Sequence, residues 1–297
     1  MKPALFDYFR PQNLPEALSL LDEFGTDAKI LAGGQSLIPL MNMRLAQPRI
    51  IIDINGIAEI GQIREKAEAL EVGALVRQRA LARYVHTDGM WELLRLGMAH
   101  IGHPQTRNQG TVGGSIAHAD PSAELPLLFL TMDGEAEIAS LRGNRKVPAE
   151  QFFQFVFSTV IQPHELLRAV HWKRPASKTA GFGFYEFSRR AGDFAMAAAA
   201  AIVEIDAQRR FTSIRLGLGG VGPTPVLVQG GDMLYGRTWS DNLIGSWLED
   251  VTKGLDPPQD LAANPDFRRR LAGAAAHKSL FSAYQSANGK WEGRTHE

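Results

Sequence analysis

The chain contains no cysteine among its 297 residues. This absence excludes disulfides, thiolate nucleophiles, and every cysteine-ligated iron–sulfur or structural zinc site. The chain also lacks an apolar run of about 18 residues, and its first residues lack the long apolar stretch of a secretory signal. We therefore expect a cytoplasmic protein with no membrane span, and any iron–sulfur centre that works with it must lie on another chain.

The chain has no net charge, because 32 Lys and Arg residues balance 32 Asp and Glu residues. No electrostatic field then favours a nucleic acid or an acidic membrane surface, and we predict no nucleic-acid partner. The apolar share of 44% supports well-buried cores. At roughly 150 residues per domain, the length predicts two or three domains.

Several common catalytic motifs are missing. There is no G-x-S-x-G nucleophile elbow and no Walker phosphate loop. Residues 217–222 match the letters of the G-x-G-x-x-G dinucleotide fingerprint, but Pro223 and Pro225 follow where that fingerprint needs a helix. We favour a glycine-rich strand exit over a Rossmann site at this position.

Two pairs of adjacent glycines, Gly33-Gly34 and Gly113-Gly114, stand 80 residues apart. Adjacent glycines let the backbone adopt positive φ and approach a ligand, so that successive N–H groups can converge on an anion. Each pair precedes a stretch that can open a helix, whose first N–H groups lack internal partners. One such pair alone would usually be an ordinary turn, whereas two predict a diphosphate held from both sides.

The hydrophobic pattern predicts three regions, 1–57, 58–175 and 176–297, the last entered through a polar linker at 175–179. The first region is a small α/β unit with strands at 4–9, 28–31 and 49–54, a helix opened by Asn13 with Glu16 in capping-box position, and a helix that Ser36 caps. The second is an α+β unit with strands at 69–72, 136–139 and 166–172 and helices at 90–100 and 125–130. The third has strands at 182–187, 195–205 and 211–218, then helices at about 240–252 and 266–286, which indicates an antiparallel sheet backed by a small bundle. The alanine run 197–201 is expected to be a tightly packed element.

The histidines and carboxylates near the second glycine pair allow several readings. His100 and His103 have a spacing that could place two metal ligands on one helix face, but a glycine and a proline interrupt that helix, so we predict no metal site. His103 or His118 could instead attach a flavin covalently, which we consider the weaker alternative. Asp120 and Glu124, four residues apart, could project from one helical face toward ribityl or ribose hydroxyls, or could simply favour the positive start of that helix.

Five segments together resemble the FAD-binding medium subunit of the molybdenum hydroxylases, the xanthine dehydrogenase and carbon monoxide dehydrogenase family. They are Phe-Asp-Tyr-Phe-Arg-Pro at 6–11, Ala-Gly-Gly-Gln-Ser-Leu-Ile-Pro at 32–39, Thr-Val-Gly-Gly-Ser at 111–115, Asp-Pro at 120–121, and Arg-Arg-Ala-Gly-Asp-Phe-Ala at 189–195. The resemblance covers almost the whole chain. It implies an α+β fold, with a two-lobed FAD-binding domain of the vanillyl-alcohol-oxidase (PCMH) type and a C-terminal domain with a three-stranded antiparallel sheet and a helical bundle.

The resemblance also implies cofactor contacts. FAD would lie between the two lobes, with its diphosphate on Leu31, Ala32, Gly33, Gly34, Gln35, Ser36, Leu37, Ile38, Thr111, Gly113, Gly114 and Ser115. Asp120 and Glu124 would contact the ribityl or adenosine part, and Ile101, Leu167 and Glu186 match positions near the cofactor. Phe194 would pack beside the flavin ring, which is itself the reactive group. Gln35 stands where the family often has His or Asn, and Ser115 stands where Asn is common, but both keep their hydrogen-bonding ability.

The resemblance further implies a division of labour within a heterotrimer or a dimer of heterotrimers. A large subunit would hold a molybdenum–pterin cofactor, a small subunit two [2Fe–2S] clusters, and this chain FAD, from which electrons pass to an external acceptor. The lack of cysteine fits that division. The substrate of the complex would be an aromatic N-heterocycle or another small organic molecule. The alternatives are a stand-alone flavin oxidase or dehydrogenase, which would need a base or a Tyr/Arg pair at a substrate pocket, and a nucleotide-binding scaffold.

Overall fold

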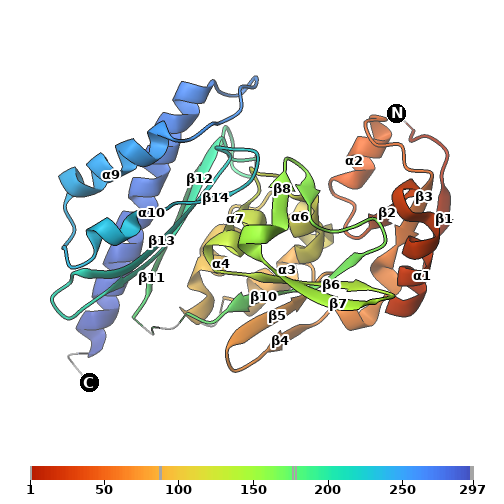
Figure 1. Ribbon diagram of the computed structural model, residues 1–297, viewed down its shortest axis with the longest axis horizontal. Helices are drawn as coiled ribbons and strands as arrows, with labels where there is room; N and C mark the ends of the chain where they lie inside the picture. Colours follow the sequence, from red (N-terminus) through yellow and green to blue (C-terminus); the bar gives the residue numbers. More distant parts are fainter. Residues whose placement is uncertain (1, 87–88, 176, 178, 295–297) are drawn as a thin grey trace. The chain divides into compact units, whose positions relative to one another are not determined.

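The computed structural model describes residues 2–86, 89–175, 177 and 179–294, so two positions of the predicted linker, 176 and 178, lie outside the described residues. The chain forms two compact units, each assembled from several segments (Figure 1). The first unit contains residues 1–83, 103–118 and 134–173, and the second contains residues 84–102, 119–133 and 174–297. Both glycine pairs therefore belong to the first unit.

A three-stranded parallel sheet begins the first unit, with the buried strand β3 between β1 and β2. Its elements are β1 (Asp7–Phe9), α1 (Leu14–Phe24), β2 (Ala28–Leu31), α2 (Leu37–Asn42) and β3 (Ile50–Asp53). The Asn13 side chain caps α1 as predicted, accepting the N–H of Glu16 at 3.0 Å. The Glu16 carboxylate accepts the N–H of Gln12 rather than that of Asn13, so the reciprocal half of the capping box is shifted by one residue.

A five-stranded antiparallel sheet, in the order β4-β5-β10-β6-β7, forms the rest of the first unit together with the hairpin β8–β9. The strands are β4 (Ile63–Glu65), β5 (Ala69–Gly73), β6 (Glu135–Ser140), β7 (Gly143–Pro148), β8 (Phe153–Phe155), β9 (Ser158–Thr159) and β10 (Leu166–Lys173). The helices are α3 (Gln78–Tyr84), which runs one residue past the unit boundary, α5 (Pro104–Gln109), α6 (Val112–His118) and α8 (Ala149–Phe152). Helix α6 packs on β5 and β10, which places the second glycine pair against this sheet.

The second unit has an antiparallel sheet in the order β11-β12-β13-β14. Its elements are α4 (Glu92–Met98), α7 (Glu124–Thr131), β11 (Gly181–Phe187), β12 (Ala197–Ile205), β13 (Phe211–Gly219), β14 (Val226–Leu227), α9 (Asp241–Lys253) and α10 (Pro265–Arg294). The three long strands lie where the pattern predicts them. The expected three-stranded sheet is nevertheless wrong by one strand, because the two-residue β14 pairs with the end of β13 and is too short to leave a periodic signal.

Small residues let α10 lie close to this sheet, as Figure 1 shows. A Cβ added to Gly181 or Gly183 would lie 1.9 Å from the backbone oxygen of Ala283 or Ser279. The alanine run 197–201 of β12 is fully buried beside it, which confirms the expected tight packing. Among the described residues, no helix has both the length and the apolar character that crossing a bilayer requires.

Candidate cofactor site

The Gly33-Gly34 segment joins the end of β2 to α2. Gly34 has a φ of +70°, the left-handed backbone that the glycine pattern predicts, whereas Gly33 does not. Ser36 stands at the N-cap of α2, but its backbone is helical and its side chain caps nothing, contrary to the expectation. The Gln35 amide donates to the carbonyl of Gly33 at 3.2 Å and braces the turn.

This segment presents a row of backbone donors. In the described part of the chain, the five N–H groups from Gly33 to Leu37 make no hydrogen bond. The first helical bond comes from Ile38, whose N–H donates to the carbonyl of Gly34 at 3.1 Å. A left-handed residue followed by unpaired N–H groups is a concave arrangement that suits an anion such as a phosphate.

The Gly113-Gly114 segment is built differently. Both glycines lie in the first turn of α6, and neither has a positive φ. Their N–H groups already have partners: Gly113 donates to the carbonyl of Ala74 at 3.0 Å, and Gly114 donates to Oγ1 of Thr111 at 3.0 Å. The expectation of a second cradle of backbone donors is therefore wrong, because the N–H groups of Gly113 and Gly114 hold α6 in place. The predicted contacts of the Thr111 and Ser115 side chains with a cofactor stay predictions.

Close packing explains why these positions are glycine. A Cβ on Gly33 would lie 2.5 Å from the carbonyl oxygen of Gln109, and a Cβ on Gly113 would lie 2.4 Å from Cβ of Ala74. A Cβ on Gly114 would lie 3.7 Å from Cβ of Ala32. The structure thus brings the two glycine segments into direct contact.

Comparisons with known proteins match both parts of the chain to known domain families. Residues 4–172 match the model of the FAD binding domain in molybdopterin dehydrogenase, and residues 182–283 match that of the CO dehydrogenase flavoprotein C-terminal domain. The chain is 36% identical to the 6-hydroxypseudooxynicotine dehydrogenase complex subunit alpha of Paenarthrobacter nicotinovorans over the full length of both chains. It is 32% identical to the carbon monoxide dehydrogenase medium chain of Hydrogenophaga pseudoflava, with 96% of this chain and 99% of the relative covered. It superposes on a chain of quinoline 2-oxidoreductase from Pseudomonas putida 86 with a TM-score of 0.91, at 34% identity and with 97% and 99% of the two chains covered.

The chain belongs to the FAD-binding medium subunits of the molybdenum hydroxylases. It is accordingly the FAD subunit of a multi-subunit oxidoreductase, as the resemblance implies. Its mixed helix and strand architecture is the FAD-binding fold of that family.

Other predicted site residues of this medium subunit are distributed over both units. Leu167 is buried in β10 of the first unit. In the second unit, Ile101 is buried in the turn after α4, and Glu186 lies on β11. Phe194 stands in the loop between β11 and β12 with 62% of its surface exposed, which leaves the ring accessible for the predicted packing beside a flavin.

Asp120 and Glu124 do not share a helical face, contrary to the prediction. Asp120 lies in the turn before α7, where its Oδ1 accepts the N–H of Ser122 at 2.9 Å, and α7 begins only at Glu124. A proline and a serine between them carry the turn, so the four-residue spacing does not correspond to one helical turn.

A buried acidic cluster surrounds Glu124 in the second unit. Burial, together with the nearby carboxylates of Glu186 and Asp120, raises the pKa of Glu124 to about 8, although His100 opposes the shift. Nδ1 of His100 lies 3.2 Å from Oε1 of Glu186, and this hydrogen bond raises the pKa of His100. Oε2 of Glu186 is buried with no hydrogen-bond partner in the described part of the chain. A neutral carboxylic acid beside an open acceptor is suited to a ligand that carries hydroxyl groups.

Two of the histidines named in the alternative predictions, His100 and His118, contact Glu186 and Phe157 respectively, and attachment of a flavin to a histidine stays a prediction. His100 follows the end of α4 at Met98, so the predicted helix over 90–100 is shorter than expected. The His118 ring stacks on Phe157 with 4.9 Å between centroids. Among the residues that the structure describes, no three His, Asp or Glu side chains are grouped as metal ligands.

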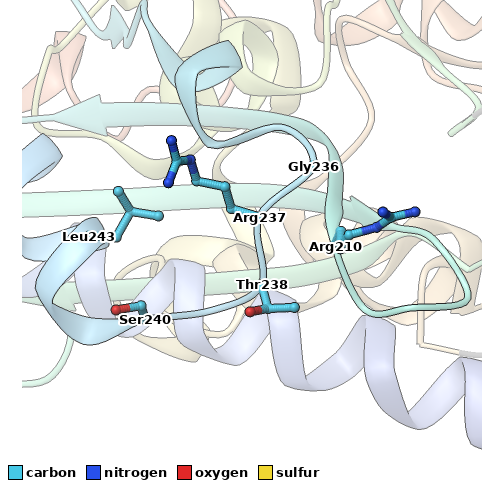
Figure 2. A pocket seen from close by; sticks show the side chains of 6 residues that line it. All are labelled: Arg210, Gly236, Arg237, Thr238, Ser240 and Leu243. Carbon is cyan, nitrogen blue, oxygen red and sulfur yellow. The ribbon is translucent and has the colours of Figure 1, made fainter.

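A shallow depression of about 440 Å³ in the second unit is a poor alternative site. It is lined by Arg210, Gly236, Arg237, Thr238, Ser240 and Leu243. Figure 2 shows that the guanidinium groups of Arg210 and Arg237 point in different directions rather than toward a common centre. Arg210 is also paired with Asp206, its Nε lying 2.7 Å from Oδ2.

Sequence reasoning missed two side chains at the glycine segments. Asn55 donates to the carbonyl of Ala32 at 2.8 Å, and Arg77 donates to the carbonyl of Gln109. Neither residue belongs to a recognisable motif. Only the position of Asn55 two residues after the buried strand β3, whose last residue pairs with the end of β2, could have indicated its role.

Proposed function

We propose that this chain binds one FAD non-covalently and serves as the subunit through which electrons leave a molybdenum hydroxylase complex. The observation that carries the proposal is the row of unpaired N–H groups from Gly33 to Leu37, inside the region that matches the family's FAD-binding domain. The bound isoalloxazine ring would supply the exchange between one-electron and two-electron chemistry. The FAD domain would be of the PCMH type, with lobes at 1–57 and 58–175 and the C-terminal domain at 176–297.

The residues present fit a dinucleotide with a diphosphate. Within the loop from Leu31 to Ile38, the N–H groups of Gly33 to Leu37 and the Ser36 hydroxyl would donate to the phosphate oxygens. Thr111 and Ser115 would add hydroxyls from the α6 side, with Gly113 and Gly114 keeping α6 close enough to do so. Glu124 and Asp120 would meet hydroxyls of the ribityl or adenosine part, where a carboxyl that remains neutral can both donate and accept.

The proposal includes partners. A large molybdenum–pterin subunit would act on the substrate, and a small subunit with two [2Fe–2S] clusters would deliver electrons to this chain, since the chain has no cysteine to hold clusters itself. The assembly would be a heterotrimer or a dimer of heterotrimers in the cytoplasm. Aromatic N-heterocycles are the first substrate class to test, because one structural relative is named for quinoline.

The direct test compares Gly34→Val with Gly143→Val. Both glycines have positive φ, +70° at Gly34 and +117° at Gly143, so both variants carry a backbone strain of about 1–3 kcal/mol. A Cβ at Gly143 would contact nothing within 4 Å, whereas one at Gly34 would lie 3.1 Å from Ile38 and occupy the donor loop. We expect the Gly143 variant and the parent protein to retain FAD that acid precipitation releases, and the Gly34 variant to lose it. Full FAD occupancy in the Gly34 variant would overturn the assignment.

A second experiment separates this function from a stand-alone oxidase. The purified chain is mixed anaerobically with candidate substrates, alone and with its two partner subunits. The flavin absorbance should persist with the chain alone and bleach once the partners are present. Rapid bleaching by substrate with the chain alone would favour the oxidase.

A further inference from the structure

The two glycine segments are joined by a continuous line of side-chain hydrogen bonds. One guanidinium nitrogen of Arg77, Nη1, donates to the carbonyl of Gln109, and the other, Nη2, donates to Oδ1 of Asn55 at 2.8 Å. Nδ2 of Asn55 then donates to the carbonyl of Ala32 at 2.8 Å. The line of hydrogen bonds therefore begins at Ala32, directly before the Gly33-Gly34 pair. It ends at Gln109, whose carbonyl oxygen packs against Gly33.

A buried carboxylate holds Asn55 in one orientation. Oδ1 of Asp53 accepts both the backbone N–H of Asn55, at 2.9 Å, and its Nδ2, at 2.6 Å, while Tyr8 donates to Oδ2. Burial alone would raise the pKa of Asp53, but the hydrogen bonds from Tyr8 and Asn55 outweigh it and lower the pKa. Asp53 is thus a charged acceptor at neutral pH. The Asn55 amide cannot be flipped, because its NH₂ would then face the donor Arg77.

The hydrogen bond from Asn55 to Ala32 sets the direction in which the N–H of Gly33 points. In a trans peptide the carbonyl of one residue and the N–H of the next point in opposite directions. Asn55 engages the carbonyl of Ala32, so the N–H of Gly33, the first of the unpaired donors, is turned away from Asn55. Gly33 also packs on the carbonyl of Gln109, which Arg77 holds, so this contact limits approach of the loop toward its neighbour while the hydrogen bonds of Asn55 and Arg77 oppose its separation.

We propose that Arg77 and Asn55 are positioning residues of the FAD site, which fix the Gly33–Leu37 donors in place before FAD binds. This inference rests on the proposed function. The planar guanidinium suits this role because it presents two donors at a fixed angle, toward Gln109 and Asn55, whereas a lysine ammonium has no fixed donor geometry on its flexible stem. A loop that is ordered in advance loses less conformational freedom on binding, so the network acts on affinity without touching the ligand.

The test titrates FAD into the full-length apo chain and its variants. Arg77→Met and Asn55→Ser should each weaken FAD binding by about tenfold or more, since the first removes the two hydrogen bonds of the guanidinium and the second removes the three of the Asn55 amide. Arg79→Met is the matched control: it removes the same charge two residues away, where Nη1 donates to the side chain of Asn108 at 3.0 Å. Its FAD affinity should stay within about twofold of the parent value.

Two further readouts separate positioning from a general loss of stability. The hydrogen bonds act in series, so the Arg77→Met/Asn55→Ser double variant should bind FAD about as weakly as either single variant, whereas independent structural damage would multiply the two effects. Guanidinium ion at millimolar concentration should restore affinity to an Arg77→Ala variant and leave Arg79→Ala unchanged. If the parent chain binds no FAD, the proposed function fails. If the parent binds FAD but Arg77→Met and Asn55→Ser bind it as tightly as Arg79→Met does, or if the two effects multiply, the positioning role is wrong and the proposed function stands.

Discussion

Replacing Glu124 with Gln should stabilise the protein in a pH-dependent way. Glu124 is only 6% exposed, and its neighbours include the carboxylates of Glu186 and Asp120 and the His100 imidazole. Its pKa rises from an ordinary 4.5 to about 8, because burial penalises the charged form and the carboxylates repel it. Glutamine keeps the shape of the neutral acid and cannot ionise.

The size of the effect follows from the difference between folded and unfolded titration. Below pH 4.5 the carboxyl is neutral in both states, so the substitution changes little. Between pH 4.5 and about 8 only the unfolded chain ionises, and the folded state of the parent loses about 1.36 kcal/mol per pH unit. At pH 7 the advantage of the Gln variant is then on the order of 3 kcal/mol, and above pH 8 it levels off at no more than about 5 kcal/mol.

The assay is thermal unfolding of the apo chain at several pH values from 4 to 9. A gain of about 3 kcal/mol at pH 7 should raise the melting temperature by roughly 5–10 °C, and the gain should vanish at pH 4. Glu165→Gln is the opposite control, since Arg145 binds both oxygens of Glu165, at 2.8 and 2.7 Å, and lowers its pKa. That variant should be less stable at neutral pH and approach the parent as the pH falls. A difference between Glu124→Gln and the parent that does not change with pH would refute the neutral state of Glu124.

Two other substitutions, Gly33→Ala and Phe194→Ala, test the site, with Gly245→Ala as a control. Gly33→Ala places a Cβ 2.5 Å from a backbone oxygen, so it should cost about 1–3 kcal/mol of unfolding free energy and weaken FAD binding, as measured by denaturation and titration. Gly245→Ala in α9, where a Cβ meets nothing within 4 Å, should instead stabilise by up to about 1 kcal/mol, and equal effects of the two would contradict the packing role of Gly33. Phe194→Ala should change the flavin potential or the rate of reoxidation by the acceptor while hydroxylation by the partner subunit is retained. Unchanged reoxidation kinetics would argue against a place beside the ring.

Hydrophobic periodicity, helix-capping residues and glycines predict much of this fold. The asparagine cap of α1, the strand that enters the first glycine pair, and the long strands β11 to β13 all follow from local signals that persist in the folded chain. The sequence does not predict the strand β14, because two residues are too few to show a hydrophobic period. It also does not predict the turn between Asp120 and Glu124, because the conformation of that turn depends on the residues packed around it.

The site shows a deeper limit of sequence reasoning. The two glycine pairs look alike as letters, yet one is a left-handed turn with unpaired donors and the other is a helix start whose donors are already used. The difference lies in the partners of the α6 N–H groups: the carbonyls of Val76 and Ala74, which follow the end of β5, accept those of Val112 and Gly113, and Oγ1 of Thr111 accepts that of Gly114. Arg77 and Asn55 were missed for the same reason, since their partners are main-chain carbonyls and leave no mark on the sequence.

The interleaving of the two units has a consequence for how the protein is made. The chain passes from one unit to the other five times, at residues 83–84, 102–103, 118–119, 133–134 and 173–174. During synthesis, the first unit cannot complete its central strand β10 until residue 173 has left the ribosome. By then residues 84–102 and 119–133 of the second unit have been synthesised, but the strands β11 to β13 of that unit have not. Such long-range closure slows folding and exposes apolar surface on the way. We therefore expect that no contiguous fragment ending before residue 173 yields a stable FAD domain, and that limited proteolysis releases neither unit intact.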